Sequence, residues 1–200
     1  MSKIDFAVLW DLDGTLIDTI ELHVYAFIEA LKRMGYDVNE EHVKAFRQRI
    51  GRRFVDIVKA IFPDMSEDEI ERLKRIRREI VLSRIDLIKP LPPSHLLPTV
   101  SRMCPTALIT SSNRQFVEIV LDRFKWRSYF DVVITGDDVK YGKPNPEPVL
   151  LALEKLGVSQ GVLIGDTEYD RLCATNAGIM FLPANKAREV LDILRSLPLV

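Results

Sequence analysis

Residues 4–18 read IDFAVLWDLDGTLID, and in this stretch an apolar run ends at Trp10 and is followed by two carboxylates, Asp11 and Asp13. A short apolar run bounded by polar residues and glycine predicts a buried β-strand, which places the carboxylate pair at a strand tip. Like charges this close together raise each other's pKa unless a cation or a bound ligand separates them. We therefore expect a positively charged partner at this point of the fold.

The composition predicts a globular protein of modest size. With 200 residues and 47% hydrophobic content, the chain fits one domain or a compact core with one inserted subdomain. The net charge of -1 favours neither nucleic acid nor a membrane as a partner, and no run of 18 apolar residues predicts a membrane span. The N-terminal run lacks the pattern of a signal peptide, and Cys104 and Cys173 fit neither a disulfide framework nor a zinc spacing. We expect a cytoplasmic protein with two structural cysteines.

Alternation of strands and helices along most of the chain predicts an α/β fold. The strand-like runs are Ile4–Trp10, Thr106–Ile109, Val132–Thr135, Val162–Gly165 and Ile179–Leu182. The helical patterns are Arg114–Phe124, Pro146–Leu156, Tyr169–Ala177 and Ala187–Leu197. This order predicts a Rossmann-like, doubly wound parallel sheet.

Residues 18–90 interrupt the alternation, because they have a helical pattern throughout. We interpret them as an all-helical cap subdomain inserted into a catalytic core of residues 1–17 and 91–200. Within the cap, Ser66 and Glu69 have the spacing of a capping box, which predicts the start of a helix. Asp18 is predicted to be the N-cap of the first cap helix.

Four groups of polar residues follow predicted strands, at the sheet edge where open α/β sheets bind their ligands. The groups are Asp11 with Asp13, Thr110-Ser111-Ser112-Asn113, Gly142-Lys143-Pro144, and Gly165-Asp166-Thr167-Glu168-Tyr169-Asp170. In this order they resemble the four motifs of the haloacid dehalogenase-like hydrolase superfamily. The helical insertion after the first motif is similar to that of its phosphoglycolate phosphatase and beta-phosphoglucomutase-like branch.

The carboxylate pair has the chemistry that phosphoester hydrolysis requires. A carboxylate nucleophile divides the reaction into two displacements through an aspartyl phosphate, and Asp11 is placed for this role. Asp13, two residues further along a strand-like segment, points the same way and is our candidate general acid/base. Asp13 also argues against carbon–halogen cleavage, because a halide leaves without a proton.

Phosphoryl transfer also needs donors and cations aimed at the equatorial oxygens of the phosphoryl group. Thr110 and Lys143 supply a hydroxyl and an ammonium, and the resemblance implies that these positions bind phosphate. Ser111 is an alternative source of the hydroxyl.

An oxygen-rich group of side chains predicts a site for a hard cation, with Mg²⁺ as the expected ion. We take Asp11, Asp13 and Asp166 as the metal ligands, with Asp13 acting through a nearby backbone carbonyl. The resemblance implies that Asp166 is a direct ligand. Asp170 is then expected to hold water molecules or Lys143.

The cap offers candidates for substrate contact. His23 lies on the opening turns of the first cap helix, where many members of the resembled branch carry a histidine close to the substrate. Arg49, Arg52 and Arg53 surround Gly51, and a cap that closes over an anionic substrate needs an inward-pointing cation. The second basic cluster, Lys74 to Arg78, is interspersed with acidic residues and is predicted to face solvent.

These observations predict a magnesium-dependent phosphomonoester hydrolase that acts on a small phosphorylated metabolite, either phosphoglycolate-like or a sugar phosphate. A sugar phosphomutase of the same family is the alternative, although the mutase-like pattern expects an arginine where Phe54 stands. A non-catalytic receiver-type module is a third interpretation, and the helical insertion argues against it. We expect no nucleic acid or membrane partner, and the sequence carries no signal for the oligomeric state.

Overall fold

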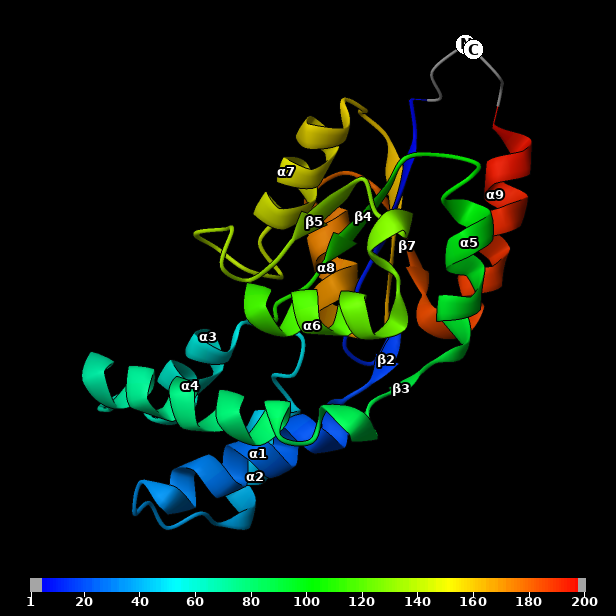
Figure 1. Ribbon diagram of the computed structural model, residues 1–200. Helices are drawn as coiled ribbons and strands as arrows, with labels where there is room; N and C mark the ends of the chain where they lie inside the picture. The colour runs from blue at the N-terminus through cyan, green and yellow to red at the C-terminus, as the bar shows by residue number, and fades with distance from the viewer. Residues whose placement is uncertain (1–4, 198–200) are drawn as a thin grey trace.

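The structure is a computed structural model that describes residues 5–197, so Ile4, at the start of the first predicted strand, lies outside the described residues. Five parallel strands form one sheet in the order β5-β4-β1-β6-β7 (Figure 1). Their bounds are β1 (Ala7–Trp10), β4 (Thr106–Ile109), β5 (Val132–Ile134), β6 (Gly161–Gly165) and β7 (Met180–Pro183). In the central strand, Leu9 is paired with Ala107 of β4 on one side and with Leu163 of β6 on the other.

Helices cover both faces of this sheet, as the sequence predicts. Val8 and Trp10 of β1 pack into one core, which includes residues of α5 (Leu97–Val100), α6 (Arg114–Phe124) and α9 (Val190–Ser196). Ala7 and Leu9 point to the other face and pack with residues of α7 (Glu147–Leu156) and α8 (Glu168–Asn176). Because alternate residues of a strand point to opposite faces, β1 contributes to both cores. The α/β, doubly wound architecture is therefore confirmed.

The predicted elements of the core agree closely with the observed ones. Helix α6 has the predicted bounds, and the side chain of Asn113 accepts a hydrogen bond from the Phe116 amide at its start. The last predicted helix is divided, because a 3₁₀ turn precedes α9. The 3₁₀ turns of the described chain are Ile85–Leu87, Pro92–Leu96, Arg127–Tyr129 and Ala184–Glu189.

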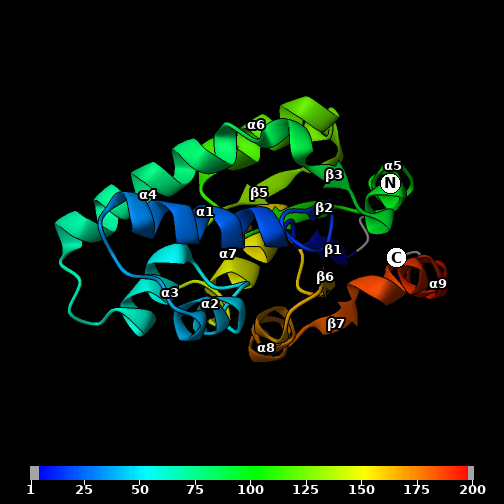
Figure 2. The same cartoon turned by 90° about the horizontal axis from the view of Figure 1, so that it is seen from below.

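The cap is helical, as expected, and is joined to the core by a short antiparallel ribbon of β2 (Ile17–Asp18) and β3 (Lys89–Pro90). Its helices are α1 (Ile20–Arg33), α2 (Glu40–Arg47), α3 (Phe54–Ile61) and α4 (Glu67–Leu82). Figure 2 shows α1 and α4 side by side. The ribbon was not predicted, and the boundaries that we propose for the cap, residues 18 and 90, run through it.

Of the two helix starts predicted in the cap, one is observed and the other is displaced by one residue. Ser66 and Glu69 form the predicted capping box, in which the Glu69 carboxylate accepts from the Ser66 amide at 3.0 Å and the Ser66 hydroxyl accepts from the Glu69 amide at 3.3 Å. The N-cap prediction for Asp18 is wrong. Asp18 is still part of β2 and is paired with Lys89, so α1 starts one residue later, after Thr19.

Both cysteines are buried and unpaired, and burial raises the pKa of each thiol to about 11. A raised pKa keeps a thiol protonated and unreactive, which agrees with a structural role. Within residues 5–197, none of the helices has the length and apolar character needed to cross a membrane.

Removal of the Phe27 ring is expected to destabilise the cap strongly. Phe27 of α1 is fully buried and stacks on Phe46 of α2 with ring centroids 4.2 Å apart. Phe27→Ala leaves a cavity and should reduce the free energy of unfolding by about 3–5 kcal/mol, measured by chemical denaturation. Tyr25→Ala, at an exposed position of the same helix, should cost less than about 1 kcal/mol. Equal losses in the two variants would contradict the packing argument.

Candidate active site

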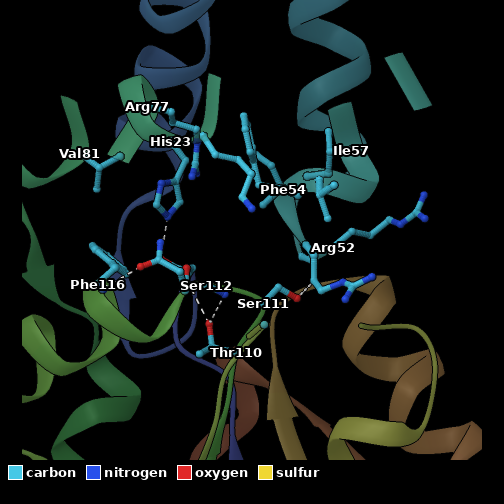
Figure 3. A pocket seen from close by; sticks show the side chains of 18 of the residues that line it. His23, Arg52, Phe54, Ile57, Arg77, Val81, Thr110, Ser111, Ser112 and Phe116 are labelled. Carbon is cyan, nitrogen blue, oxygen red and sulfur yellow. Dashed lines mark hydrogen bonds and ion pairs between the residues drawn. The ribbon is translucent and has the colours of Figure 1, made fainter. Parts of the chain in front are cut away.

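A cavity of about 390 Å³ lies between the core and the cap. The core contributes Asp11, Asp13 and Thr110 to its lining, and the cap contributes His23, Phe54 and Arg77. Figure 3 shows Thr110 at the core end of this cavity and Arg77 at the cap end, with His23 between them. The polar groups that follow β1 and β4 thus meet at one sheet edge, as predicted.

Lys143 forms the centre of a buried charged cluster at the base of the site. Its ammonium donates to Asp11 at 2.6 Å, to Asp170 at 2.5 Å and to the Ile109 carbonyl at 3.0 Å, which uses all three of its donors. Burial disfavours the ammonium, but the carboxylates of Asp11 and Asp170 outweigh this effect and raise the pKa of Lys143 well above its usual value. Lys143 is therefore a permanent positive charge beside Asp11, although it does not contact Asp13.

Asp11 lies in an environment that opposes its ionisation. Burial raises the pKa of Asp11 well above its usual value, Lys143 acts in the opposite direction, and the carboxylates of Asp170 and Asp166 add to the increase. Lys143 alone does not balance three neighbouring acids. This local excess of negative charge is a favourable setting for a divalent cation.

Asp166 completes the acidic group and is held by the first motif. The Thr15 hydroxyl donates to Asp166 at 2.9 Å. Gly14 has a φ of +85°, and a Cβ at this position would lie 2.4 Å from an Asp166 oxygen, so the backbone approaches the carboxylate as only glycine allows. Burial raises the pKa of Asp166 to about 6, although the Thr15 hydrogen bond acts in the opposite direction.

Three carboxylates are close enough to share one metal ion. Asp11, Asp166 and Asp170 each offer an oxygen, and these oxygens all lie within 4.8 Å of one another. All the donors are carboxylate oxygens, which hard cations such as Mg²⁺ prefer, so the residues fit that ion. The Asp13 carboxylate is not part of this group. Asp170, which was expected to hold water or Lys143, contacts Lys143. Its carboxylate also accepts a hydrogen bond from the Thr167 hydroxyl at 2.6 Å.

Asp13 has a separate set of partners, because the chain leaves the strand after Trp10. Its carboxylate accepts from Thr19 at 2.6 Å and from Ser112 at 2.7 Å, and it lies 2.9 Å from Nε2 of His23. Burial favours the neutral acid, but the charge of His23 and the hydrogen bonds from His23, Thr19 and Ser112 outweigh it and hold the pKa of Asp13 well below its usual value. The two carboxylates of the first motif therefore face different partners.

The hydroxyls of the second motif have two different acceptors, because Thr110 and Ser112 face Asp13 and Ser111 faces the cap. Thr110 lies 3.5 Å from Asp13 and accepts from the Ser112 amide, within the cavity. Ser111 donates to the Gly51 carbonyl of the cap at 2.6 Å. The Thr110 hydroxyl thus faces the cavity and makes only a long contact with Asp13, whereas the Ser111 hydroxyl joins the core to the cap.

The loop of the cap around Gly51 contacts the core at several points. Gly51 has a φ of +103°, and a Cβ there would lie 2.7 Å from the Thr167 hydroxyl. Arg53 pairs with Asp56 at 2.9 Å and donates to the Val139 carbonyl of the core. Arg49, which follows α2, donates to the Ala45 carbonyl of that helix and does not line the cavity. Of the three arginines proposed for substrate contact, only Arg52 and Arg53 reach the cavity.

The second basic cluster departs from its prediction. Lys74, Arg77 and Arg78 of α4 line the cavity, whereas a solvated face was expected. Burial lowers the pKa of Arg77 to about 10, and the charge of Asp13 acts in the opposite direction. The helical spacing of the buried residues in α4 could have indicated that Arg77 faces inward. Arg77 is four residues after Leu73 and three before Ile80, both buried, so it lies on the inward face of the helix.

Sequence analysis also missed three hydroxyls that position the acids: Thr15, Thr19 and Ser112. Thr19 precedes His23 by four residues, and both contact Asp13. That spacing puts two side chains on the same side of a helix start and could have identified them as a pair.

The sequence of this chain is similar to that of known hydrolases. The family model described as haloacid dehalogenase-like hydrolase matches residues 8–184. A putative pyrophosphatase PpaX from Caldanaerobacter subterraneus subsp. tengcongensis is 32% identical over 186 residues, covering 86% of this chain and 78% of the relative.

Solved structures agree in fold. A hydrolase from Pseudomonas syringae has a TM-score of 0.79 with 26% identity, covering 88% of this chain and 82% of its own. A variant of CbbY from Rhodobacter sphaeroides, in complex with xylulose-(1,5)bisphosphate, has a TM-score of 0.79 with 25% identity, covering 90% and 85%. With a family model that matches most of its length, this chain belongs to the haloacid dehalogenase-like hydrolases, as a phosphatase of the branch that carries a helical cap.

Proposed function

We propose that this protein is a magnesium-dependent phosphatase that transfers the phosphoryl group of a small phosphorylated molecule to Asp11 and then to water. One observation carries the proposal: Asp11 and Asp13 line one cavity but have different partners, Lys143 for the first and His23 for the second. Two acids in distinct environments are suited to two distinct roles.

In the first step, an oxygen of Asp11 attacks the phosphorus and the leaving oxygen departs. Lys143 holds Asp11 through a 2.6 Å contact and places a fixed positive charge beside the equatorial oxygens of the phosphoryl group. Thr110 lies in the cavity next to Asp13 and donates its hydroxyl to the same phosphoryl group. We assign phosphate binding to Thr110 and Lys143, and we assign Ser111 to the contact with the cap.

Asp13 moves the proton. It protonates the leaving oxygen in the first step and takes a proton from the attacking water in the second. The contacts with His23, Thr19 and Ser112 fix the orientation of its carboxylate and hold its pKa well below the usual value, so the resting group is ionised. The negative phosphoryl group raises this pKa when the substrate binds beside it, and Asp13 then takes up the proton that it delivers to the leaving oxygen.

Asp11 and Asp166, with a backbone carbonyl near Asp13, are the proposed ligands of Mg²⁺, and Asp170 holds Lys143 beside them. When bound, Mg²⁺ offsets the negative charge of the acids and of the phosphoryl group. The geometry supports this assignment, because oxygens of Asp11, Asp166 and Asp170 all lie within 4.8 Å of one another. Burial, together with the neighbouring carboxylates, raises the pKa of Asp11 and of Asp166, and a bound cation would favour their ionised forms.

The name of the PpaX relatives makes pyrophosphate a first substrate to test, beside phosphoglycolate and sugar phosphates. Phe54 lines the cavity at the position where the mutase-like pattern expects an arginine, so hydrolysis is favoured over a mutase reaction. The two free, buried thiols agree with a reducing, cytoplasmic setting for a small-molecule phosphatase.

The test is release of inorganic phosphate from p-nitrophenyl phosphate, pyrophosphate, phosphoglycolate and a panel of sugar phosphates. We expect turnover with Mg²⁺, loss of turnover after chelation, and recovery when Mg²⁺ is added back. Absence of turnover of every compound in the presence of Mg²⁺ would refute the proposed function.

Substitution of Gly51 is expected to impair closure of the cap over the site. In Gly51→Ala, both the φ of +103° and the 2.7 Å approach to Thr167 oppose the observed loop conformation. Backbone strain of this kind costs about 1–3 kcal/mol, so kcat/KM should fall by about 10- to 100-fold, measured by steady-state kinetics.

Gly35→Ala is the matched control for this prediction. Gly35 also has a positive φ, of +87°, but a Cβ there meets nothing within 4 Å. This variant should lose stability while keeping its kcat/KM. If the two variants lose activity equally, the contact between Gly51 and the core does not govern closure.

A further inference from the structure

Arg77 of α4 is an arginine without a polar partner inside the cavity. It forms no hydrogen bond and no ion pair with any residue in the described range 5–197, and its Nε atom is buried without a partner. A half-buried guanidinium without a direct counter-charge is costly, and such groups are normally paired. Asp13 acts on Arg77 only through its charge, without a contact, so the side chain can still take an anion in direct contact.

The other cations of the cavity lining differ from Arg77. Arg53 pairs with Asp56, Lys74 pairs with Glu71 at 2.7 Å, and Arg78 donates to Gln115 at 3.3 Å. Arg52 lies over the Tyr169 ring, with its guanidinium carbon 6.0 Å from the ring centroid, on the α8 side of the loop. Three of these four cations therefore have polar contacts within the described residues. Arg52 has none, and its Nε is also buried without a partner, but its guanidinium lies over Tyr169 of α8 and not over a ring of the cap.

Arg77 is also held in place. Its guanidinium carbon lies 4.4 Å from the centroid of the Phe54 ring, which restricts the side chain while leaving its N–H donors unused. Val81 of the cap and Phe116 of the core add apolar surface to the lining of the same cavity. An arginine stacked on a ring with free donors is a preorganised receptor for a carboxylate or a phosphate.

The position of Arg77 relative to the reacting groups fits a substrate with two charged ends. Figure 3 shows Arg77 across the cavity from Thr110, with His23 between them. The transferred phosphoryl group occupies the core end, near Asp11, Lys143 and Thr110. A second anion on the same small molecule would then face Arg77.

We propose that Arg77 binds the non-transferred anionic group of the substrate, and that the substrate class is small phosphate compounds with a second carboxylate or phosphate. This inference rests on the proposed function for the position of the transferred group. It makes Arg77 a residue that determines specificity, with no part in the chemical steps.

The test compares compounds with and without the second charge. Phosphoglycolate and pyrophosphate carry it, and 2-hydroxyethyl phosphate has a neutral tail of similar length to phosphoglycolate. Binding is measured by calorimetry on the Asp11→Asn protein, which cannot turn the compounds over, and kcat/KM is measured on the otherwise unchanged protein. We expect at least one doubly charged compound to bind about 10- to 100-fold more tightly than 2-hydroxyethyl phosphate.

Arg77→Met, which keeps an apolar side chain against Phe54, should abolish that preference and leave the affinity for 2-hydroxyethyl phosphate within about threefold. Arg77→Lys should restore part of it, because the charge remains without the planar guanidinium. Arg75→Met, at an exposed position of the same helix outside the cavity lining, should leave the preference intact.

The outcomes separate this inference from the proposed function. If no doubly charged compound is preferred, or if Arg77→Met weakens all three compounds equally, the inference is wrong even when the enzyme is active. If the protein turns over nothing but binds a doubly charged compound in an Arg77-dependent way, the inference stands and the proposed hydrolysis fails.

Discussion

Asp11→Asn is expected to reduce kcat by at least about 10⁴-fold for every substrate, because an amide oxygen cannot form the aspartyl phosphate on which both steps depend. The fold should survive the change. Lys143 keeps its contacts with Asp170 and the Ile109 carbonyl, and the substitution removes one of three mutually repelling acids. The measurement is phosphate release under saturating substrate, with thermal unfolding as the check on structure.

Asp86→Asn is the matched control for this prediction. Asp86 is an exposed residue that pairs with Arg123 far from the cavity lining, so its loss should leave kcat unchanged. Retention of more than about a tenth of the activity in Asp11→Asn would show that another group is the nucleophile, or that water attacks the phosphorus directly.

Asp13→Asn is expected to slow both proton transfers, with a loss of about 10²- to 10⁴-fold in kcat for alkyl phosphates. The phosphorylation step should be less affected with p-nitrophenyl phosphate, because p-nitrophenolate leaves without protonation. Hydrolysis of the aspartyl phosphate still needs a base. Rapid mixing should therefore reveal a burst of p-nitrophenolate, equal to the concentration of active sites, followed by a slow steady state.

Metal affinity provides the control for Asp13→Asn. The Asp13 carboxylate is not one of the three acids whose oxygens lie within 4.8 Å of one another, so Mg²⁺ binding measured by calorimetry should change little. A collapse of Mg²⁺ affinity with normal turnover per bound ion would contradict the acid/base assignment. An equal loss for good and poor leaving groups, without a burst, would contradict it as well.

Regular elements with strong local patterns were predictable from the sequence. Helix α6 was predicted from Arg114 to Phe124, which are its observed ends, because its apolar residues recur at helical spacing and Asn113 caps it. The ribbon of β2 and β3 was not predictable in this way. Its four residues pair only because the chain leaves and re-enters the core at one place, and Pro90 is an unfavourable strand residue in isolation.

The positions of the site residues were predictable where they depend on the ends of strands, and less predictable where they depend on the path of a loop. Asp11, Thr110 and Lys143 were expected to converge because parallel strands end at one edge of a sheet, and they do. Their detailed partners depended on the path of the chain after Trp10, which turns Asp13 toward His23. Arg77 was interpreted as solvated because acidic neighbours in the sequence were weighed more heavily than its helical spacing.

The position of β1 in the middle of the sheet has a consequence for the synthesis of this protein. Its two hydrogen-bonded neighbours, β4 and β6, both follow the whole cap in the chain, so β1 is synthesised before either of its partners in the sheet is available. The cap helices make local contacts and are free to pack during this time. Until β6 emerges, an apolar strand remains open to chaperones and to aggregation, and the nucleophile has neither Lys143 nor Asp166 beside it. The active site therefore forms only after β6 has been synthesised.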